Sequence, residues 1–208
     1  MTSTTPGPGR PKDLAKRQAI LEAAKALFLR HGYEGSSMEA IAREARVSKL
    51  TVYNHFSDKD TLFLEAVKAK CEEQLPQLFE ARDTDDPVEA RLLSIGRAFL
   101  GLINSPESLA MHRLMFGLAH TNPTLVQLFY GAGPGRILSE LERFLRQADR
   151  SGQLRIPQPS VAAEHFCAML KGGYNFRLLI GLARAQPAED AERHVREVVG
   201  MFVRAFTP

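Results

Sequence analysis

A nine-residue stretch of the chain is rich in hydrogen-bond donors and contains no acidic side chain. From Ser48 to Phe56 it reads Ser-Lys-Leu-Thr-Val-Tyr-Asn-His-Phe. On a helix, the four-residue spacing of Val52 and Phe56 puts both on one apolar face. A surface with a cation, hydroxyls and an amide but no carboxylate suits a phosphate-lined nucleic-acid groove. The face opposite Val52 carries Lys49, Leu50, Thr51, Tyr53, Asn54 and His55.

Two short helices joined by a tight turn must position this face. The first is expected to open at Ser36, whose hydroxyl could accept from a free backbone N–H while Glu39 reaches back, as in a capping box. The turn Ala45-Arg46-Val47 leads into the second helix, for which Ser48 is a good N-cap. Such a pair forms a helix-turn-helix, whose second helix fits a major groove ~12 Å wide. The apolar stripe of the first helix is Met38, Ile41, Ala42 and Ala45.

Longer helices are predicted on either side of this pair. Upstream, apolar residues recur at helical spacing until Gly32, which suits the end of a helix. Downstream, Ser57-Asp58-Lys59-Asp60 repeats the capping-box pattern at the start of another helix. The residues expected to face inward are Ile20, Leu21, Ala24, Leu27 and Phe28 upstream, and Leu62, Phe63, Ala66 and Val67 downstream.

The rest of the chain is also predicted to be helical, so the predicted fold class is all-α. No stretch alternates polar and apolar residues between hairpin turns, and no sheet is expected. Prolines fall at the proposed helix starts or in the gaps, where proline is tolerated. After an acidic, turn-rich segment that ends at Pro87, helices are expected at about 87–104, 106–120, 123–131, 134–150, 159–182 and 188–206.

The formal net charge of +3 is confined to one end of the chain. Residues 1–60 carry ten Lys and Arg against seven Asp and Glu, whereas residues 61–208 carry 17 of each sign. Such asymmetry suggests a polyanionic partner for the N-terminal part alone.

Composition excludes several other classes of protein. The two cysteines, Cys71 and Cys167, are too few for a disulfide framework, and we expect them to be free thiols that pack as small hydrophobes in a reducing compartment. No apolar run reaches the ~18 residues of a membrane span, and the first residues lack a signal core, so we expect a cytoplasmic protein without membrane contact. The rival interpretations are an enzyme or carrier bundle and an architectural DNA-binding protein without a sensor.

The sequence offers no residues that would support an enzymatic function. The six histidines are scattered without the i, i+4 spacing of a helical metal site. No nucleophile elbow or P-loop occurs, and the glycines from Gly131 to Gly135 lack a preceding strand. We expect no catalytic site, no metal and no cofactor. The long, electrically neutral C-terminal half argues against a purely architectural role.

Residues 17–64 closely resemble the DNA-binding domain of the TetR family of regulators. The resemblance runs from Arg-Gln-Ala-Ile-Leu-Glu-Ala-Ala through Val-Ser-Lys-Leu-Thr-Val-Tyr-Asn-His-Phe-Ser-Asp-Lys-Asp-Thr-Leu-Phe-Leu. It implies a homodimer of all-α subunits, usually a repressor, that leaves its operator when a small molecule binds the C-terminal domain. The implied partners are double-stranded DNA with a palindromic operator, a second copy of the chain, and a small apolar or amphipathic inducer.

The resemblance and the chemistry together assign DNA contacts. Lys49, Leu50, Thr51 and Asn54 are expected at base edges, with Leu50 against a thymine methyl. Tyr53 and His55 are expected to contact the DNA backbone and so position the helix on the duplex. Ser37 and Lys59 lie at helix starts, where phosphate binds. Arg46 stands where many relatives have Gly; a positive φ there would cost ~1 kcal/mol, and its side chain could add a phosphate contact. The predicted set is Ser37, Arg46, Ser48, Lys49, Leu50, Thr51, Tyr53, Asn54, His55 and Lys59.

Four regions follow from these assignments. We expect residues 1–11 to form a disordered basic arm, 12–60 the helix-turn-helix DNA-binding domain, 61–82 a connecting helix and 83–208 a ligand-sensing and dimerisation domain. The arm segment Gly9-Arg10-Pro11-Lys12 could reach a minor groove or only add electrostatic affinity, and both readings stay open. The last two helices carry wide apolar faces that could form a four-helix interface with a second copy.

The C-terminal half is similar to the C-terminal domain of an AefR-like subgroup. The matching pieces are His112-Arg113-Leu114, Leu128-Phe129-Tyr130-Gly131-Ala132-Gly133-Pro134 and Ala163-Glu164-His165-Phe166-Cys167-Ala168-Met169-Leu170. This resemblance implies regulation of efflux or stress-linked genes. An inducer cavity should be mostly apolar and enclosed between helices, although for each single lining residue ordinary core packing is the stronger interpretation. The predicted lining is Phe99, Ile103, Met111, His112, Met115, Phe116, Phe129, Phe166, Met169, Leu170 and Tyr174.

Overall fold

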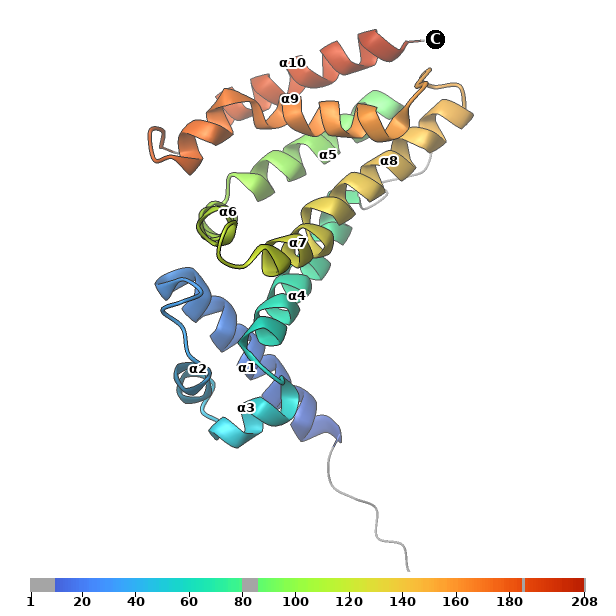
Figure 1. Ribbon diagram of the computed structural model, residues 1–208. Coiled ribbons are helices and arrows are strands. Elements are labelled where there is room, and N and C mark those ends of the chain that lie inside the picture. The colour runs from blue at the N-terminus through green and yellow to red at the C-terminus, as the bar shows by residue number, and fades with distance from the viewer. Residues whose placement is uncertain (1–9, 80–85, 185, 208) are drawn as a thin grey trace, which may run out of the picture. The chain divides into compact units, whose positions relative to one another are not determined.

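The computed structural model describes residues 10–79, 86–184 and 186–207. Within these ranges the chain is all-α, as predicted, and contains ten helices (Figure 1). They divide between two compact units, the first ending at Ala69 and the second starting at Lys70. The helices are α1 (Arg10–His31), α2 (Met38–Glu44), α3 (Lys49–His55), α4 (Lys59–Phe79), α5 (Val88–Ile103), α6 (Pro106–Leu118), α7 (Pro123–Ala132), α8 (Pro134–Arg150), α9 (Pro159–Leu179) and α10 (Ala188–Phe206).

The boundary between the units falls inside α4, within the segment predicted to be a connecting helix. Helix α1 begins at Arg10, inside the predicted arm, and residues 1–9 of that arm lie outside the described residues. No helix in the described ranges is long and apolar enough to cross a bilayer.

The first unit packs around an aromatic cluster. Phe28 of α1, Phe63 of α4 and Tyr33 of the loop after α1 are all buried, and their ring centroids lie 5.1 to 5.9 Å apart. Edge-to-face and offset ring contacts add ~0.5–1.5 kcal/mol each to the burial itself. The residues predicted to face inward upstream and downstream of the helix pair are all buried.

The start of α2 differs from the prediction by one residue. Ser37, not Ser36, is the N-cap, and its hydroxyl accepts from the Ala40 N–H over 3.1 Å. Ser36 is buried and donates its hydroxyl to the Gly32 carbonyl at 2.7 Å, which ties the loop back to the end of α1. The capping-box assignment of Ser36 and Glu39 is therefore wrong.

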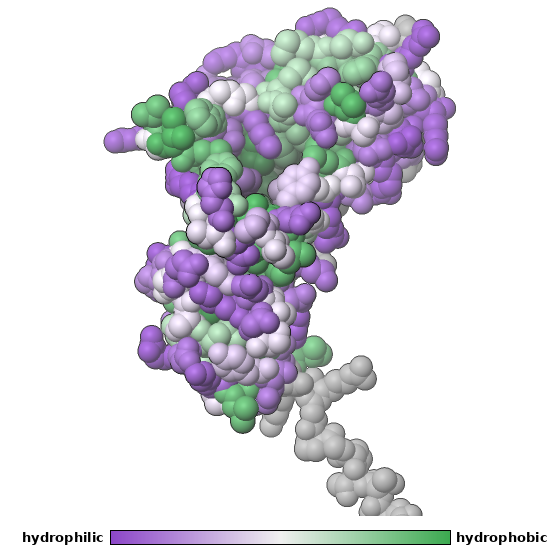
Figure 2. All heavy atoms as spheres, in the orientation of Figure 1, coloured by the Kyte–Doolittle hydropathy of each residue, from purple (hydrophilic) through white to green (hydrophobic). Residues whose placement is uncertain are grey.

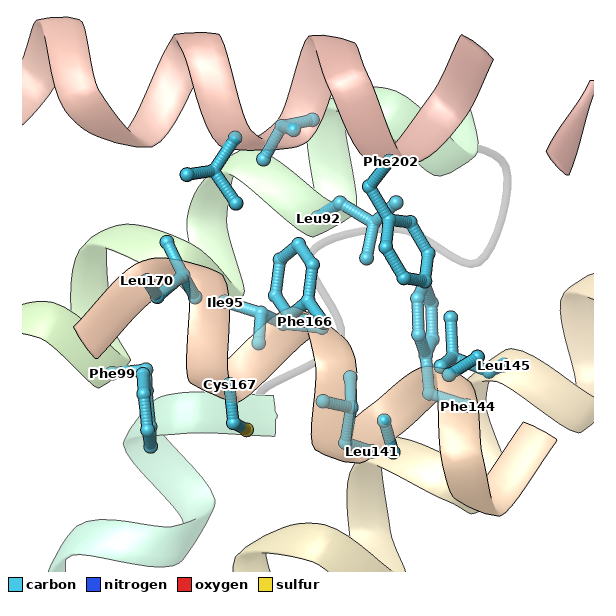
Figure 3. Close-up of a cluster of buried hydrophobic side chains, with 14 of the residues drawn as sticks. Leu92, Ile95, Phe99, Leu141, Phe144, Leu145, Phe166, Cys167, Leu170 and Phe202 are labelled. Carbon is cyan, nitrogen blue, oxygen red and sulfur yellow. The ribbon is translucent and has the colours of Figure 1, made fainter. Parts of the chain in front are cut away.

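The second unit has a core formed mainly by α5, α8, α9 and α10. Figure 3 shows side chains from these four helices meeting in one layer, with Phe166 and Phe202 edge to face at 5.0 Å. Truncation of a fully buried Phe such as Phe166 costs about 3–5 kcal/mol, so this layer supplies much of the unit's stability. Cys167 lies in the same layer, and burial raises the pKa of its thiol to about 11.

Helix α9 is not continuous, in contrast to the single helix predicted over 159–182. Gly172 has φ 50° and ψ −171°, a conformation that favours glycine strongly, and the helix ends at Leu179. Polar side chains hold the segment after the break. Asn175 donates to the Asn104 side chain over 2.9 Å, and Arg113 of α6 donates to the carbonyls of Leu178 and Leu179 at 2.6 and 2.7 Å.

Candidate nucleic-acid interface

Helix α3 is fixed from behind by two buried side chains. Val52 and Phe56 are almost fully buried, as predicted, and the Arg17 guanidinium of α1 lies 5.2 Å from the centre of the Phe56 ring. The Ser48 hydroxyl caps the helix by accepting from the Thr51 N–H over 3.0 Å. These contacts hold a seven-residue helix that would not be stable alone.

The outward face of α3 has the composition predicted for it. Lys49, Leu50, Tyr53 and Asn54 are exposed, whereas Thr51 and His55 are partly buried. Leu50 is 70% exposed and is the one aliphatic side chain among these four. In Figure 2 the surface of the first unit is largely hydrophilic, with a green area over α3. Arg46, Ser48 and Ser37 are also exposed, so the structure brings the predicted contacts of α2 and α3 to the surface.

The turn between α2 and α3 adopts a left-handed conformation at a residue with a side chain. Arg46 has φ 56°, and no other non-glycine residue in the described ranges has a positive φ. Its N–H donates to the Arg43 carbonyl at 3.2 Å, while the Val47 N–H donates to the Ala42 carbonyl at 3.0 Å. This pair of hydrogen bonds is the Schellman arrangement, in which glycine is preferred. The positive φ that would make a side chain costly at position 46 is therefore present, and the Arg46 side chain destabilises the turn by ~1 kcal/mol.

An ion pair that the sequence did not reveal links α2 to α3. The Lys49 ammonium donates to the Glu39 carboxylate, and each side chain is 55% exposed. The hydrogen bond from Lys49 lowers the pKa of Glu39, and the same bond raises the pKa of Lys49. The Lys49 Nζ also lies 5.8 Å from the centre of the Tyr53 ring. Sequence reasoning missed the pair because it assigned Glu39 to helix capping.

The Lys59 ammonium, predicted to contact phosphate, is held by other residues of the protein. Its Nζ donates to the Tyr33 carbonyl over 3.1 Å and sits 4.1 Å from the centre of the Tyr33 ring. Only 25% of its side chain is exposed, and the Glu34 carboxylate lies 4.0 Å from the ammonium. The helix it opens is capped by Asp58, whose carboxylate accepts from the Thr61 N–H at 2.7 Å.

The residues predicted to line an inducer cavity differ in how deeply they are buried. Those in the main core of the second unit are Phe99, Ile103, Phe166 and Leu170, with Met169 packed against them; Met115 and Phe129 are buried elsewhere, and Met111, His112 and Tyr174 are partly buried. Phe116 is 63% exposed, so its assignment to an enclosed cavity is wrong. The reason is helical geometry: α6 packs through Leu109, Met115 and Leu118, and Phe116 points away from that face.

His112 is the most constrained polar residue of the predicted lining. Its Nδ1 must donate to the Ser108 carbonyl, 2.6 Å away, because a carbonyl can only accept. The neutral ring then presents an acceptor lone pair at Nε2. The ring also meets Phe129 of α7 edge to face, with centroids 6.0 Å apart. This side chain therefore combines a fixed tautomer with an aromatic neighbour.

An apolar depression of about 420 Å³ lies on the surface formed by α9 and α10. Figure 2 shows green surface over these two helices. Met169 alone among the predicted cavity residues lines it. The lining residues are His165, Ala168, Met169, Met201, Phe202, Ala205 and Phe206.

Family models match both units of the chain. Residues 20–66 match the model of bacterial regulatory proteins of the tetR family, and residues 90–208 match that of the AefR-like transcriptional repressor C-terminal domain. The chain is also 27% identical over 195 residues to the HTH-type transcriptional repressor AcnR of Corynebacterium diphtheriae. This alignment covers 93% of this chain and 94% of AcnR.

Two solved structures share the fold over nearly the whole chain. A TetR-family transcriptional regulator from Mesorhizobium loti superposes with a TM-score of 0.83 at 28% identity, covering 96% of this chain and all of the other. The flavonoid-responsive regulator FrrA gives a TM-score of 0.80 at 28% identity, covering 93% of this chain and 97% of FrrA. The matched proteins are transcription regulators, which are not enzymes. The chain belongs to the TetR family of bacterial transcription regulators, and its C-terminal domain is of the AefR-like type.

Proposed function

We propose that this regulator binds a specific palindromic operator as a homodimer, represses transcription there, and leaves the DNA when a small molecule binds the second unit. The observation that carries the proposal is the exposed, acid-free face of α3, which is held from behind by Val52 and Phe56. A helix of this size and composition can enter a major groove with its polar side toward the base edges. An operator on the chromosome places this activity in the cytoplasm.

The proposed contacts divide between base edges and phosphates. Lys49, Thr51 and Asn54 donate to base edges, and Leu50 covers a thymine methyl. Tyr53, His55, Ser48, Ser37 and Arg46 position the duplex through its backbone. Lys59 keeps its place over the Tyr33 ring and uses another of its three N–H donors for a phosphate.

We propose dimerisation through α9 and α10, so that each dimer carries two recognition helices. Support comes from the apolar depression on these helices, which exposed Met201 helps to line, and from the exposure of Val161 on α9. Two such faces related by a two-fold axis form a four-helix interface. The two copies of α3 would then read half-sites ~34–36 Å apart.

The inducer is proposed to be a small molecule that is apolar or amphipathic. FrrA is described as flavonoid-responsive and AcnR as a repressor, which supports both small-molecule control and the repressing sign. His112 is the polar anchor we favour, because its ring meets the Phe129 ring and its acceptor Nε2 suits a hydroxyl group on an aromatic ligand.

Selection of random duplexes by the purified protein tests this function. We expect enrichment of a palindrome whose half-sites are one helical turn apart. Binding without any enriched sequence would overturn specific recognition, and enrichment of single half-sites would overturn the dimer. Ligand response is tested separately by the rise in unfolding temperature with a panel of hydroxylated aromatic compounds.

A further inference from the structure

The ion pair between Glu39 and Lys49 lies on the surface assigned to DNA. Glu39 is in the first turn of α2, close to the N-cap Ser37, and Lys49 is the first residue of α3. Both side chains are more than half exposed, so the pair faces solvent and any duplex that approaches α3. Between Met38 and Phe56 the chain has only one other acidic residue, Glu44.

A carboxylate at this position repels an approaching polyanion, so its presence on this surface needs an explanation. The pair is exposed, so it contributes little to folding. It does, however, engage the only lysine of the recognition helix. Phosphate and Glu39 are both anionic partners for the same ammonium, and Lys49 cannot satisfy one fully without leaving the other.

We infer that Glu39 competes with DNA for Lys49 and thereby suppresses binding to non-operator sequences, an inference that rests on the proposed DNA-binding function. On a non-operator duplex, Lys49 could gain only a phosphate contact, which replaces one anion by another and leaves Glu39 without its cation. On the operator, a base edge that accepts from Lys49 supplies a directed contact in addition to the phosphate field. The pair therefore penalises general electrostatic binding more than specific binding.

The contact also explains the ionisation of both groups. The bond to Lys49 is the largest cause that lowers the pKa of Glu39, so the carboxylate stays charged to more acidic pH than an ordinary glutamate. An ammonium held by that carboxylate stays protonated as well. Neither group changes charge near neutral pH, so competition between anions, and not titration, decides where Lys49 goes.

The test compares Glu39→Gln with Glu44→Gln in the full-length protein. Glu44 is exposed on the same helix and forms no ion pair with Lys49, so its substitution matches the change in net charge. Binding is measured on the selected operator and on a scrambled duplex over a range of salt. For Glu39→Gln on scrambled DNA we expect about threefold tighter binding per subunit and a salt slope steeper by about 0.9 per subunit. Operator affinity should rise less, so the specificity ratio falls.

Two further variants separate competition from general charge effects. In a Lys49→Gln background, Glu39→Gln should have no more effect than Glu44→Gln, because the cation in dispute is gone. In the absence of DNA, the carboxyl titration of Glu39 followed by NMR should move upward in Lys49→Gln. An unmoved titration, or equal behaviour of Glu39→Gln and Glu44→Gln on scrambled DNA, would overturn the competition. If the wild type itself prefers no sequence, the proposed function fails instead, and the two failures remain distinct.

Discussion

His194 of α10 donates from Nε2 to the Leu170 carbonyl over 3.0 Å, two residues before the break in α9. A break in a helix leaves carbonyls without their usual N–H partners, and a buried carbonyl without a donor is costly. Here a side chain from the neighbouring helix satisfies one of them. The break is thus accommodated by packing and by polar contacts on both of its sides.

Replacement of Gly172 by Ala should destabilise the second unit by about 1–3 kcal/mol, because residues other than glycine rarely adopt its backbone conformation. A new Cβ would meet the His194 ring only at 3.7 Å, an ordinary contact, so backbone strain and not a clash is the cause. Thermal unfolding measures the change. The control is Gly101→Ala in α5, where a Cβ meets nothing within 4 Å and better helix propensity should stabilise by about 0.5–1 kcal/mol. Equal effects at both sites would refute the strain.

Arg46→Gly should change stability and DNA binding in opposite directions. Removal of the side chain from a left-handed position should stabilise the first unit by about 1 kcal/mol. The loss of the proposed phosphate contact should weaken binding to all sequences and reduce the salt slope by about 0.9 per subunit. Arg46→Ala separates the two effects, since it removes the charge and keeps the strain. A gain in stability in Arg46→Ala equal to that in Arg46→Gly would contradict the account.

The acid sensitivity of the second unit should depend in part on Glu192. Its carboxylate accepts from Arg97 of α5 at 2.7 Å and from Arg196 at 2.7 Å, and the bond from Arg97 is the main reason that its pKa falls to about 2. A carboxylate whose pKa is lower in the folded than in the unfolded state stabilises the fold at pH values above its unfolded-state pKa. This stabilisation is lost as pH falls from about 4.5 toward 2.

Glu192→Gln should therefore flatten the dependence of the unfolding free energy on pH between about 4.5 and 2, measured by denaturant titration. Salt should reduce the difference, because the pair is accessible to solvent. Glu197→Gln, exposed on the same helix and without an ion pair to Arg97, serves as the control. An unchanged pH profile in Glu192→Gln would show that the pair does not persist in solution.

Local signals predicted much of this structure, and contacts between distant residues account for the rest. Ser48 could be identified as a cap because its hydroxyl accepts from a backbone N–H only three residues further along the chain, that of Thr51. Ser36 was misassigned because either of two adjacent serines could have been the cap; its hydroxyl instead donates to the Gly32 carbonyl, four residues earlier. The break at Gly172 was missed since the side chains that hold it come from α6 and α10 and from the end of α5.

The candidate DNA surface shows the same division. The outward face of α3 follows from the spacing of Val52 and Phe56, which is local information. The ion pair of Lys49 with Glu39 and the contact of Lys59 with Tyr33 depend on how separate helices cross, and they join residues ten and 26 positions apart. Spacing along one helix predicts which side is exposed, but it cannot predict what meets that side from another element.

Asn54→Ala and Tyr53→Phe should weaken DNA binding in different ways if the assigned contacts are correct. Asn54 is exposed on the groove-facing side, so its truncation should reduce discrimination by about 1–3 kcal/mol at the base it reads and relax the selected sequence there. Tyr53→Phe keeps the ring beside Lys49 and removes only the hydroxyl, so it should weaken operator and scrambled DNA by the same factor. Competition binding against single-base operator variants distinguishes the two patterns. The division between base and backbone contacts is wrong if both variants shift every duplex equally.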